Sequence, residues 1–480
     1  MFPLPNKIAS SWIGVIIISI FLFCISVPVI TAKTNEEIYQ EKLSELKPDD
    51  VNGHYQLGLW CRKNGLILEA YQEFEKVIKL EPKHAEAKKQ LDSLVDPLVE
   101  KYIEADDPVI LEKIKAHDTI SPTEVKKWVN FIKTRLLKKP KCEGKEVFIL
   151  HHPKYPIKYR VEGKTKGEKL SLLVLLHGGG QDPSANEESW QRISGRGFFG
   201  QSASKHFDLV AIPRCWDKEG AQWPWIQPSA VEYILAMIDE IKRSYNIDTN
   251  RIYLAGVSMG AEGTCQIGCA VADRFAALGM CAGGLIGGAR LANLLNTSLT
   301  IHVGEKDTQH GASIIDRARK IKATMEELQG KYKDGYKFLY KEYPGMGHAV
   351  PGSAYQEIFA WIEEFKRDPV PHHIILEVSF DFPQRRYFYW LKIAQPAQGM
   401  RIEAQVQDKN RVVVTTKGVK EFTIFLNDKL VDLAQPVTVE VDGVVKYQEK
   451  VKSSLTAILE SLVAKEDPEM VFTAHVDISQ

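Results

Sequence analysis

The sequence predicts an α/β protein built around a mostly parallel β-sheet, with an α-helical segment before the sheet and an all-β module after it. From about 143 to 367, short β-rich runs alternate with helical stretches, which is the pattern of a parallel sheet covered by helices on both faces. Between about 35 and 138 the chain is rich in Glu, Lys and Leu, with apolar residues at helical spacing. From 370 onward, apolar and polar residues alternate between turn residues, apart from one helical stretch at SSLTAILESLVA. We therefore expect four parts: a leader at 1–32, a helical segment at 33–140, an α/β domain at 141–368 and a mostly β accessory domain at 369–480.

Composition excludes several classes of partner. The 480 residues carry a formal net charge of zero, so there is no global basic field to hold a phosphate backbone, and nucleic acid is not an expected partner. The sequence has no CxxC motif and no His/Cys cluster with the spacing of metal ligands. We predict neither a metal nor a cofactor.

The chain begins with the pattern of an export signal. Lys7 precedes an apolar stretch from Trp12 to Ile30, which ends in the small-residue exit Thr31-Ala32. The apolar run is also long enough to cross a bilayer, so a signal peptide and an uncleaved membrane tether through residues 12–30 both remain open. Either alternative predicts an exported protein, periplasmic or extracellular.

The helical segment contains the spacing of a tetratricopeptide repeat. Its matching positions are Leu57, Gly58, Ala70, Phe74 and Pro82. His54 and Cys61 stand where such repeats usually have aromatic residues, and Pro48 lies one repeat length before Pro82. The segment resembles one repeat with degenerate flanks and would then offer a surface for a protein partner. An amphipathic helical hairpin that packs on the next domain is the alternative.

A strand followed by a glycine-flanked serine is the strongest chemical signal. The run RIYLAG leads directly into Gly256-Val257-Ser258-Met259-Gly260, and the residues that follow are able to start a helix. A serine on such a sharp turn adopts a strained backbone, so its neighbours must be small and its hydroxyl stands exposed above the sheet. We expect Ser258 to be a nucleophile, which requires a base to accept its proton and an acid to orient the base.

The base and the acid are expected downstream, at the ends of the next two strands. The strand LTIHVG leads to Asp307, and the strand YKFLYKEYP leads to His348. Because the carboxyl ends of parallel strands share one edge of the sheet, both side chains should meet Ser258 there. Taken singly, Asp307 is equally typical of a turn or helix cap and His348 of a surface loop. Glu305 is the alternative acid and His310 the alternative base.

Attack on an ester also needs amide groups that hold the oxyanion. One donor should be the amide of Met259, directly after the nucleophile. The second should come from the loop after the strand LSLLVLLH, where Gly179 is our choice and Gly178 and Gly180 shape the turn. A glycine-rich turn without a ligand is the alternative, and no Gly-Lys-Ser/Thr follows that would make the loop a phosphate site.

Through LLVLLHGGG, GVSMG, VGEKD and GMGHAV, the chain resembles the α/β-hydrolase superfamily over about 225 residues. Within it, the chain looks like the branch of polyhydroxybutyrate depolymerase-like esterases, feruloyl and acetylxylan esterases and phospholipase/carboxylesterases. The resemblance implies hydrolysis of carboxylic esters through an acyl-enzyme, without a cofactor. It covers neither the helical segment nor the β module. A serine peptidase of the same fold and a non-catalytic scaffold are the alternatives.

The loop RCWDKEGAQWPW should lie at the same edge of the sheet and carries Trp216, Trp223 and Trp225. Aromatic faces there would stack on a sugar ring or an aromatic acyl group of a substrate, or wall an apolar acyl pocket. The alternative, which we favour, is that the three side chains pack the loop down. Cys265, Cys269 and Cys281 lie close together in the sequence, and packing is favoured over a disulfide for them.

Overall fold

The computed structural model describes residues 33–143, 146–193, 198–216, 223–308, 313–379, 386–408 and 410–480. The chain divides into two compact units, one ending at Leu91 and one beginning at Asp92, and each is described by itself. Residues 12–30, predicted to be an export signal or a tether, lie outside the described residues. Within the described ranges, every helix is too short or too polar to cross a membrane.

The first unit consists of consecutive helices. They are α1 (Asn35–Glu45), α2 (Val51–Lys63), α3 (Ile67–Leu80) and α4 (Ala85–Ser93), the last of which runs past the boundary. Gly58 lets α2 approach α3 closely, because an added Cβ would lie 2.7 Å from the Phe74 ring. His54 is buried, and its Nδ1 lies 2.5 Å from a carboxylate oxygen of Glu73, which also accepts a hydrogen bond from the Tyr39 hydroxyl at 2.9 Å. The tetratricopeptide interpretation of this unit stays a prediction.

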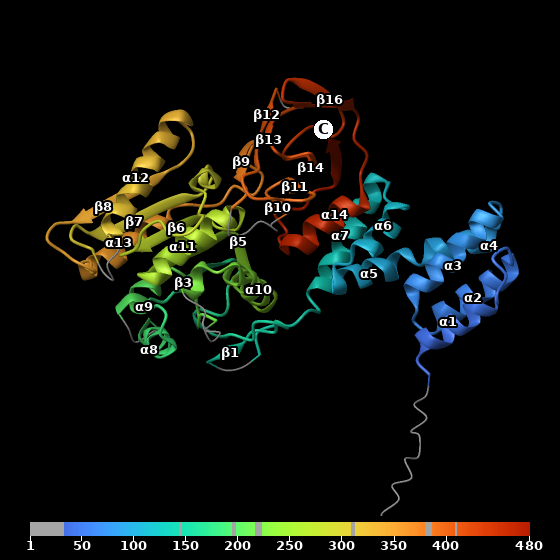
Figure 1. The fold of residues 1–480 in the computed structure, drawn as a ribbon, viewed down its shortest axis with the longest axis horizontal. Coiled ribbons are helices and arrows are strands. Elements are labelled where there is room, and N and C mark those ends of the chain that lie inside the picture. Colours follow the sequence, from blue (N-terminus) through green and yellow to red (C-terminus); the bar gives the residue numbers. More distant parts are fainter. Residues whose placement is uncertain are drawn as a thin grey trace, which may run out of the picture. The chain divides into compact units, whose positions relative to one another are not determined.

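The second unit is built on an eight-stranded mixed sheet, drawn from teal to orange in Figure 1. Its strands are β1 (Phe148–Ile149), β2 (Lys158–Gly163), β3 (Leu170–Leu176), β4 (Leu209–Pro213), β5 (Ile247–Val257), β6 (Ala277–Cys281), β7 (Ser298–Gly304) and β8 (Phe338–Tyr343). Their order is β1-β2-β4-β3-β5-β6-β7-β8. The strands from β4 to β8 in this order are parallel, while β1 and β2 are antiparallel to their neighbours. Every residue of β3 and of β7 is buried, as expected for strands covered on both faces. The predicted mostly parallel sheet is confirmed.

Helices cover both faces of this sheet. The helices α8 (Pro183–Ile193), α9 (Phe198–Ala203) and α13 (Gly352–Glu363) contribute to one apolar core. The helices α10 (Pro228–Ser244), α11 (Met259–Ala270) and α12 (Ile314–Lys331) contribute to the core on the other face. Short 3-10 turns at Pro224–Ile226, Ala272–Arg274 and Leu291–Leu294 complete the connections. The sheet is therefore buried on both faces, and polar side chains are accommodated at the ends of its strands.

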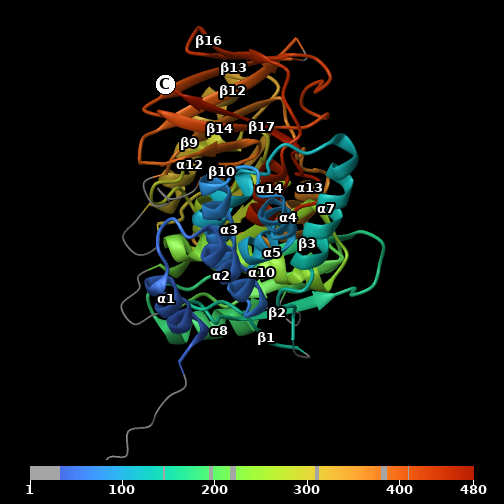
Figure 2. The same ribbon diagram turned by 90° about the vertical axis from the view of Figure 1, so that its right-hand side faces the viewer.

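The C-terminal part holds two further sheets, orange to red in Figures 1 and 2. Its elements are β9 (His373–Glu377), β10 (Tyr387–Phe388), β11 (Leu391–Ile393), β12 (Arg401–Gln407), β13 (Arg411–Lys417), β14 (Glu421–Leu426), β15 (Val437–Val441), β16 (Val444–Glu449), α14 (Leu455–Lys465) and β17 (Ala474–Ser479). The sheet orders are β16-β15-β13-β12-β9 and β10-β11-β14-β17. Burial alternates along β12 and β13, and the inward residues of both sheets join one core, as the period-two pattern predicts.

Three more helices belong to the second unit: α5 (Val95–Ala105), α6 (Pro108–Lys115) and α7 (Pro122–Leu136). Helix α7 lies beside α14, as Figure 1 shows in teal and red. After α6, the Asp118 carboxylate accepts hydrogen bonds from the Thr456 amide at 2.7 Å and from the Ser454 hydroxyl at 2.9 Å. These helices thus pack on the C-terminal part, and the domain boundaries at 140 and 368 stay predictions.

Buried charges tie α14 and the loop after it to the large sheet. The Lys465 ammonium lies 2.5 Å from the Asp273 carboxylate, and the Arg367 guanidinium lies 2.5 Å from the Asp467 carboxylate. All four side chains are almost completely buried, and Arg367 holds the pKa of Asp467 well below its usual range, against the effect of burial. Removing one partner of such a pair leaves an uncompensated charge, which costs about 3–5 kcal/mol.

Candidate active site

The turn between β5 and α11 carries Ser258 in a strained backbone conformation. Its φ is 57° and its ψ is −122°, a region that residues with a side chain rarely adopt. The glycines on either side are needed for packing: a Cβ on Gly256 would lie 2.3 Å from the Gly260 carbonyl oxygen, and one on Gly260 would lie 2.3 Å from the Leu176 carbonyl oxygen. The short spacing of the motif therefore reflects the close contact of this turn with the end of β3.

The structure brings Ser258, His348 and Asp307 into one hydrogen-bonded chain, which we call the candidate triad. His348 Nε2 lies 2.8 Å from the Ser258 Oγ, and His348 Nδ1 lies 3.0 Å from both carboxylate oxygens of Asp307. Asp307 is completely buried, whereas the His348 side chain keeps 22% of its surface exposed. Because an ionised carboxylate only accepts hydrogen bonds, Nδ1 carries the proton and Nε2 is free to accept one from the serine hydroxyl.

The loops after β7 and β8 hold each other through their backbones. The Lys306 amide donates a hydrogen bond to the Met346 carbonyl oxygen at 2.7 Å. Gly304, the last residue of β7, lies under the loop that carries His348, because an added Cβ would come within 2.0 Å of the Gly347 carbonyl oxygen. Any side chain at Gly304 would push that loop away, so this glycine helps to position the imidazole.

The alternative acid and base lie elsewhere or outside the described residues. The Glu305 carboxylate is exposed and accepts a hydrogen bond from the Gly345 amide at 2.7 Å, where it fixes the turn that follows β8. Asp307, not Glu305, contacts the imidazole. His310 falls in the segment 309–312, which lies outside the described ranges.

The glycine loop after β3 lies against Ser258. A Cβ on Gly178 would lie 3.4 Å from the Ser258 Cβ. Gly179 has a φ of 128°, which favours glycine, and an added Cβ would come within 2.0 Å of the Asn186 side-chain oxygen. The Asn186 side chain is buried and bonds both backbone groups of Gly180. It accepts a hydrogen bond from the Gly180 amide at 2.9 Å and donates one to the Gly180 carbonyl oxygen at 3.1 Å. Asn186 was not singled out in the sequence, where it is one polar residue in a helical stretch.

His177 orients the peptide group between Gly178 and Gly179. Its ring is completely buried, its Nε2 accepts a hydrogen bond from the Cys215 amide at 3.2 Å, and its Nδ1 lies 2.6 Å from the Gly178 carbonyl oxygen. A ring nitrogen that accepts leaves the other nitrogen as the donor, so the Gly178 carbonyl is directed toward His177. The C=O and N–H of a trans peptide point in opposite directions, and the Gly179 amide therefore points away from His177.

The three tryptophans of the loop after β4 lie in different surroundings. Trp225 is completely buried, and its indole N–H donates to the His177 carbonyl oxygen at 3.0 Å. Its ring also meets the His177 ring edge-on, with centroids 5.1 Å apart. Trp216 and Trp223 are partly buried and pack against the same core. Of the two interpretations, packing applies to Trp225, because its ring is completely buried and a substrate cannot reach it.

One ion pair between a buried carboxylate and a partly exposed arginine lies close to the candidate triad and was not singled out in the sequence. Arg317 Nη2 on α12 lies 2.8 Å from Glu262 Oε1 on α11. Burial raises the pKa of Glu262, and the negative charge of Asp307 adds to this rise while Arg317 opposes it. An ion pair between residues so far apart in the chain has no local sequence pattern that would predict it.

The cysteines near the elbow are buried thiols. Cys265 and Cys269 lie inside α11, and Cys281 ends β6. The hydrogen bond with Cys265, together with burial, raises the pKa of Cys269 well above its usual value, and burial raises the pKa of Cys281 to about 12. Such thiols stay protonated and do not act as nucleophiles at neutral pH.

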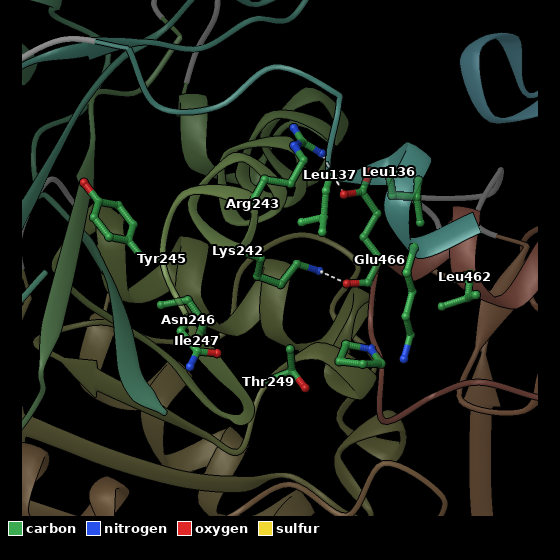
Figure 3. Close-up of a pocket in the computed structure, with 12 residues that line it drawn as sticks. Leu136, Leu137, Lys242, Arg243, Tyr245, Asn246, Ile247, Thr249, Leu462 and Glu466 are labelled. Atoms are coloured by element: carbon green, nitrogen blue, oxygen red, sulfur yellow. Dashed lines mark hydrogen bonds and ion pairs between the residues drawn. The ribbon is translucent and has the colours of Figure 1, made fainter. Parts of the chain in front are cut away.

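A pocket elsewhere in the second unit, of about 220 Å³, lies between α7, α10, the start of β5 and the end of α14. Figure 3 shows Lys242 and Arg243 pointing toward Glu466 there. Arg243 Nη1 donates to the Glu466 carboxylate at 2.7 Å, and Lys242 donates to the Glu466 carbonyl at 3.0 Å. Thr249 lines this pocket at the opposite end of β5 from Ser258, so the pocket is separate from the candidate triad. In the described part of the chain, no three His, Cys, Asp or Glu side chains gather as metal ligands.

No family model matches the chain. Among curated proteins, it is similar to a bifunctional acetylxylan esterase/xylanase of Neocallimastix patriciarum, with 31% identity over 129 residues, which are 25% of this chain and 17% of that protein. It is also similar to a poly(3-hydroxybutyrate) depolymerase of Ralstonia pickettii, with 29% identity over 131 residues, which are 25% of this chain and 26% of that protein. The matches thus span about a quarter or less of the length of these relatives.

Solved structures with a similar arrangement include a thermostable esterase, at 23% identity and a TM-score of 0.38, where the match covers 46% of this chain and 62% of that one. A carboxylesterase of Bacillus cereus is similar at 16% identity and a TM-score of 0.33, with 43% of this chain and 94% of that one covered.

Proposed function

We propose that the chain is an exported serine hydrolase of the α/β-hydrolase superfamily that cleaves carboxylic esters through an acyl-enzyme. Ser258 is the nucleophile, His348 the general base and Asp307 the orienting acid. The hydrogen-bonded chain from Ser258 through His348 to a fully buried Asp307 is the observation that carries this proposal. It is supported by the mixed sheet with helices on both faces and by the similarity to two proteins whose names describe ester-cleaving enzymes.

The reaction follows from this geometry. Ser258 Oγ attacks the ester carbonyl carbon while its proton passes to His348 Nε2, and the carbonyl oxygen becomes an oxyanion. When the C–O bond to the alcohol breaks, the same Nε2 proton goes to the leaving oxygen, and Ser258 is left acylated. Water then attacks the acyl-enzyme with His348 again as base, which releases the acid and restores the serine. Asp307 keeps the Nδ1 proton in place and stabilises the imidazolium that forms twice per cycle.

The amides of Met259 and Gly179 are proposed to hold the oxyanion. Met259 is the first residue of α11, and the first amides of a helix have no partner within it. The Gly178 carbonyl is bonded to the His177 ring, so the Gly179 amide in the same peptide group points away from His177. The Gly180 amide is already bonded to Asn186, which leaves Gly179 as the second donor. Both donors are backbone groups held by buried side chains, as preorganised stabilisation requires.

The substrate class is proposed from the similarity to the two curated relatives. Their names describe one enzyme that acts on acetylxylan and one that acts on poly(3-hydroxybutyrate), both of which are carboxylic esters. Short-chain acyl esters of a hydroxylated polymer or a polyester are therefore the first substrates to screen. Trp216 and Trp223, which are only partly buried, are the two tryptophans that we propose as substrate contacts, together with the backbone of Gly178 and Gly180.

The proposal is tested by hydrolysis of a short-chain p-nitrophenyl ester and by labelling with a fluorophosphonate. The wild-type protein should turn over the ester and take up one label, and Ser258→Ala should lose the label together with at least about 10³-fold of kcat/KM. Ser202→Ala, at a buried serine in α9, is the matched control and should keep both. Turnover or labelling that survives Ser258→Ala would refute the assignment.

A further inference from the structure

We propose that Glu262 and Arg317 are a positioning pair for the candidate triad: their ion pair joins the helix that begins at the nucleophile to the helix that contacts the acid, and its two charges act on the imidazole. This inference rests on the proposed esterase function and adds two residues to its machinery. Glu262 is buried and Arg317 is bonded to it, so we assign both residues a role that acts through Ser258, Asp307 and His348.

On one side, Glu262 is bonded to the nucleophile through the backbone. It lies in the first turn of α11, and its amide donates to the Ser258 carbonyl oxygen at 3.1 Å. Its side chain is buried with only 3% of the residue exposed. A shift of Glu262 therefore moves the strained turn that aims the Ser258 hydroxyl at His348.

On the other side, Arg317 belongs to the helix that contacts the acid. The Ile315 amide in the first turn of α12 donates to the Asp307 carbonyl oxygen at 3.1 Å, and Arg317 follows two residues later. Arg317 Nη2 lies 2.8 Å from Glu262 Oε1. The pair thus closes a path that runs from Ser258 along α11, across to α12 and back to Asp307.

Two glycines let the helices come this close. Gly283 and Gly284 follow β6 and pass between α11 and α12. A Cβ on Gly283 would lie 2.5 Å from the Ala261 Cβ, and one on Gly284 would lie 2.7 Å from the Arg317 Cβ. With no side chains in this stretch, the ion pair is what spans the gap between the two helices.

Within the described part of the chain, the ion pair of Glu262 and Arg317 leaves one polar atom of each side chain without a hydrogen bond. Glu262 Oε2 and Arg317 Nε are buried and have no hydrogen-bond partner among the described residues. A bidentate pair would bond both oxygens, and an ion pair that makes one contact and leaves 26% of the arginine side chain exposed adds little to the free energy of unfolding. Stability alone therefore does not account for this pair.

The charges of the pair reach the imidazole through Asp307, which influences Glu262 and is bonded to His348. In the described residues, the charged or titratable groups around the pair and the acid are Asp307 after β7, His348 after β8, Glu262 on α11, Arg317 on α12, the Cys281 thiol at the end of β6 and the Tyr355 hydroxyl on α13 beside that thiol. Burial raises the pKa of Glu262, and the negative charge of Asp307 adds a smaller contribution in the same direction. A negative charge at Glu262 stabilises the imidazolium at His348, and the positive charge at Arg317 opposes this effect.

The test is the pH dependence of kcat/KM for p-nitrophenyl acetate, whose acid limb reports the loss of the proton from the base. Glu262→Gln keeps an acceptor for Arg317 but removes the negative charge, so the acid limb should move to lower pH by about half a unit. Arg317→Met removes the positive charge and should move the limb to higher pH by a similar amount, and kcat should fall about tenfold with KM little changed, because the triad is displaced. In the double variant the two pH shifts should cancel.

Two further variants separate charge from structure. Arg317→Lys keeps the cation and should return the acid limb to its wild-type position. Arg319→Met is the matched control, since Arg319 lies on the same helix and pairs with Glu342 at the surface, and it should leave the limb and kcat unchanged. Thermal unfolding of each variant reports folding, and if Arg317→Met does not fold, the isosteric Glu262→Gln alone decides.

Limbs that stay in place, or that move in the same direction in both single variants, would overturn the positioning pair. The pH dependence of the rate at which fluorophosphonate labels Ser258 provides the same readout without an ester. A wild-type protein that neither hydrolyses esters nor takes up the label would instead refute the proposed function, and the pair with it. A wild-type protein that is active through Ser258 but has unmoved limbs in the variants would refute only the pair.

Discussion

Among the described residues of the second unit, a serine, a histidine and an aspartate meet at the candidate triad and again at a second cluster, and the two differ in their bonding. The second cluster joins α6, α14 and β17 and consists of Asp118, Ser454 and His475. Ser454 Oγ lies 3.1 Å from His475 Nδ1 and 2.9 Å from an Asp118 carboxylate oxygen. By residue types and distances alone, this cluster resembles the candidate triad.

The bonding separates the two clusters. Ser454 is the N-cap of α14, and its hydroxyl oxygen accepts from the Ala457 amide at 2.9 Å while its proton goes to Asp118. A hydroxyl has one proton, so a serine that donates to a carboxylate does not donate to a histidine as well. Asp118 receives the serine and the Thr456 amide instead of orienting the imidazole. The linear order of serine, histidine and acid exists only in the candidate triad.

The backbone conformations of the two serines also differ. Ser454 has an ordinary extended conformation, with φ −127° and ψ 127°, whereas Ser258 has a φ of 57°. Strain of this kind costs about 1–3 kcal/mol and persists only where the surroundings impose it. The comparison teaches that a candidate site is recognised by which atom donates to which, and by strain kept at the nucleophile, rather than by the presence of three residue types.

The largest expected difference concerns the two aspartates. Asp307→Asn should lower kcat by about 10⁴-fold, because the amide favours the wrong tautomer of His348. Asp118→Asn should leave kcat and KM unchanged, since among the described residues the Asp118 carboxylate is bonded to Ser454 and Thr456 at the start of α14. Steady-state kinetics with a p-nitrophenyl ester measures both variants. Equal losses in the two variants would break the distinction between the clusters.

Local sterics explain how much of the site was accessible from the sequence. The elbow around Ser258 is a short-range pattern, because Gly256 and Gly260 are required by contacts within a few residues and with the adjacent strand. Asp307 and His348 follow from topology, since the carboxyl ends of parallel strands meet at one edge. The sheet and the alternation in the C-terminal strands are predicted for the same reason.

Contacts between distant segments were not accessible in this way. Asn186, which holds the glycine loop, and the pair of Glu262 and Arg317 depend on how helices pack on the sheet, and a single sequence contains no period or spacing for such pairs. The same holds for Ser454 and Asp118, which are 336 positions apart. For the tryptophans the sequence left two interpretations, and the burial of Trp225 depends on its contact with His177.

A smaller effect is expected on stability at the second cluster. Ser454→Ala removes the N-cap of α14 together with the bond to Asp118, and should lower the free energy of unfolding by about 1–2 kcal/mol without changing kcat. Ser121→Ala, at the exposed start of α7, is the matched control and should cost less, because water replaces the lost bonds there. Urea unfolding followed by circular dichroism measures both. A large loss of activity in Ser454→Ala at full stability would mean that the second cluster takes part in catalysis.

The smallest expected effect tests which carboxylate near the imidazole is the acid. Glu305 lies two residues before Asp307, but its carboxylate accepts from the Gly345 amide and supports the turn before His348. Glu305→Gln keeps an acceptor for that amide and removes only an exposed charge, so kcat should fall by no more than about threefold. A fall near that of Asp307→Asn would transfer the orienting role to Glu305. Because the two positions share one loop and both substitutions leave the backbone bonds in place, a difference of three orders of magnitude would have to come from the side-chain contact with the imidazole, which Asp307 makes and Glu305 does not.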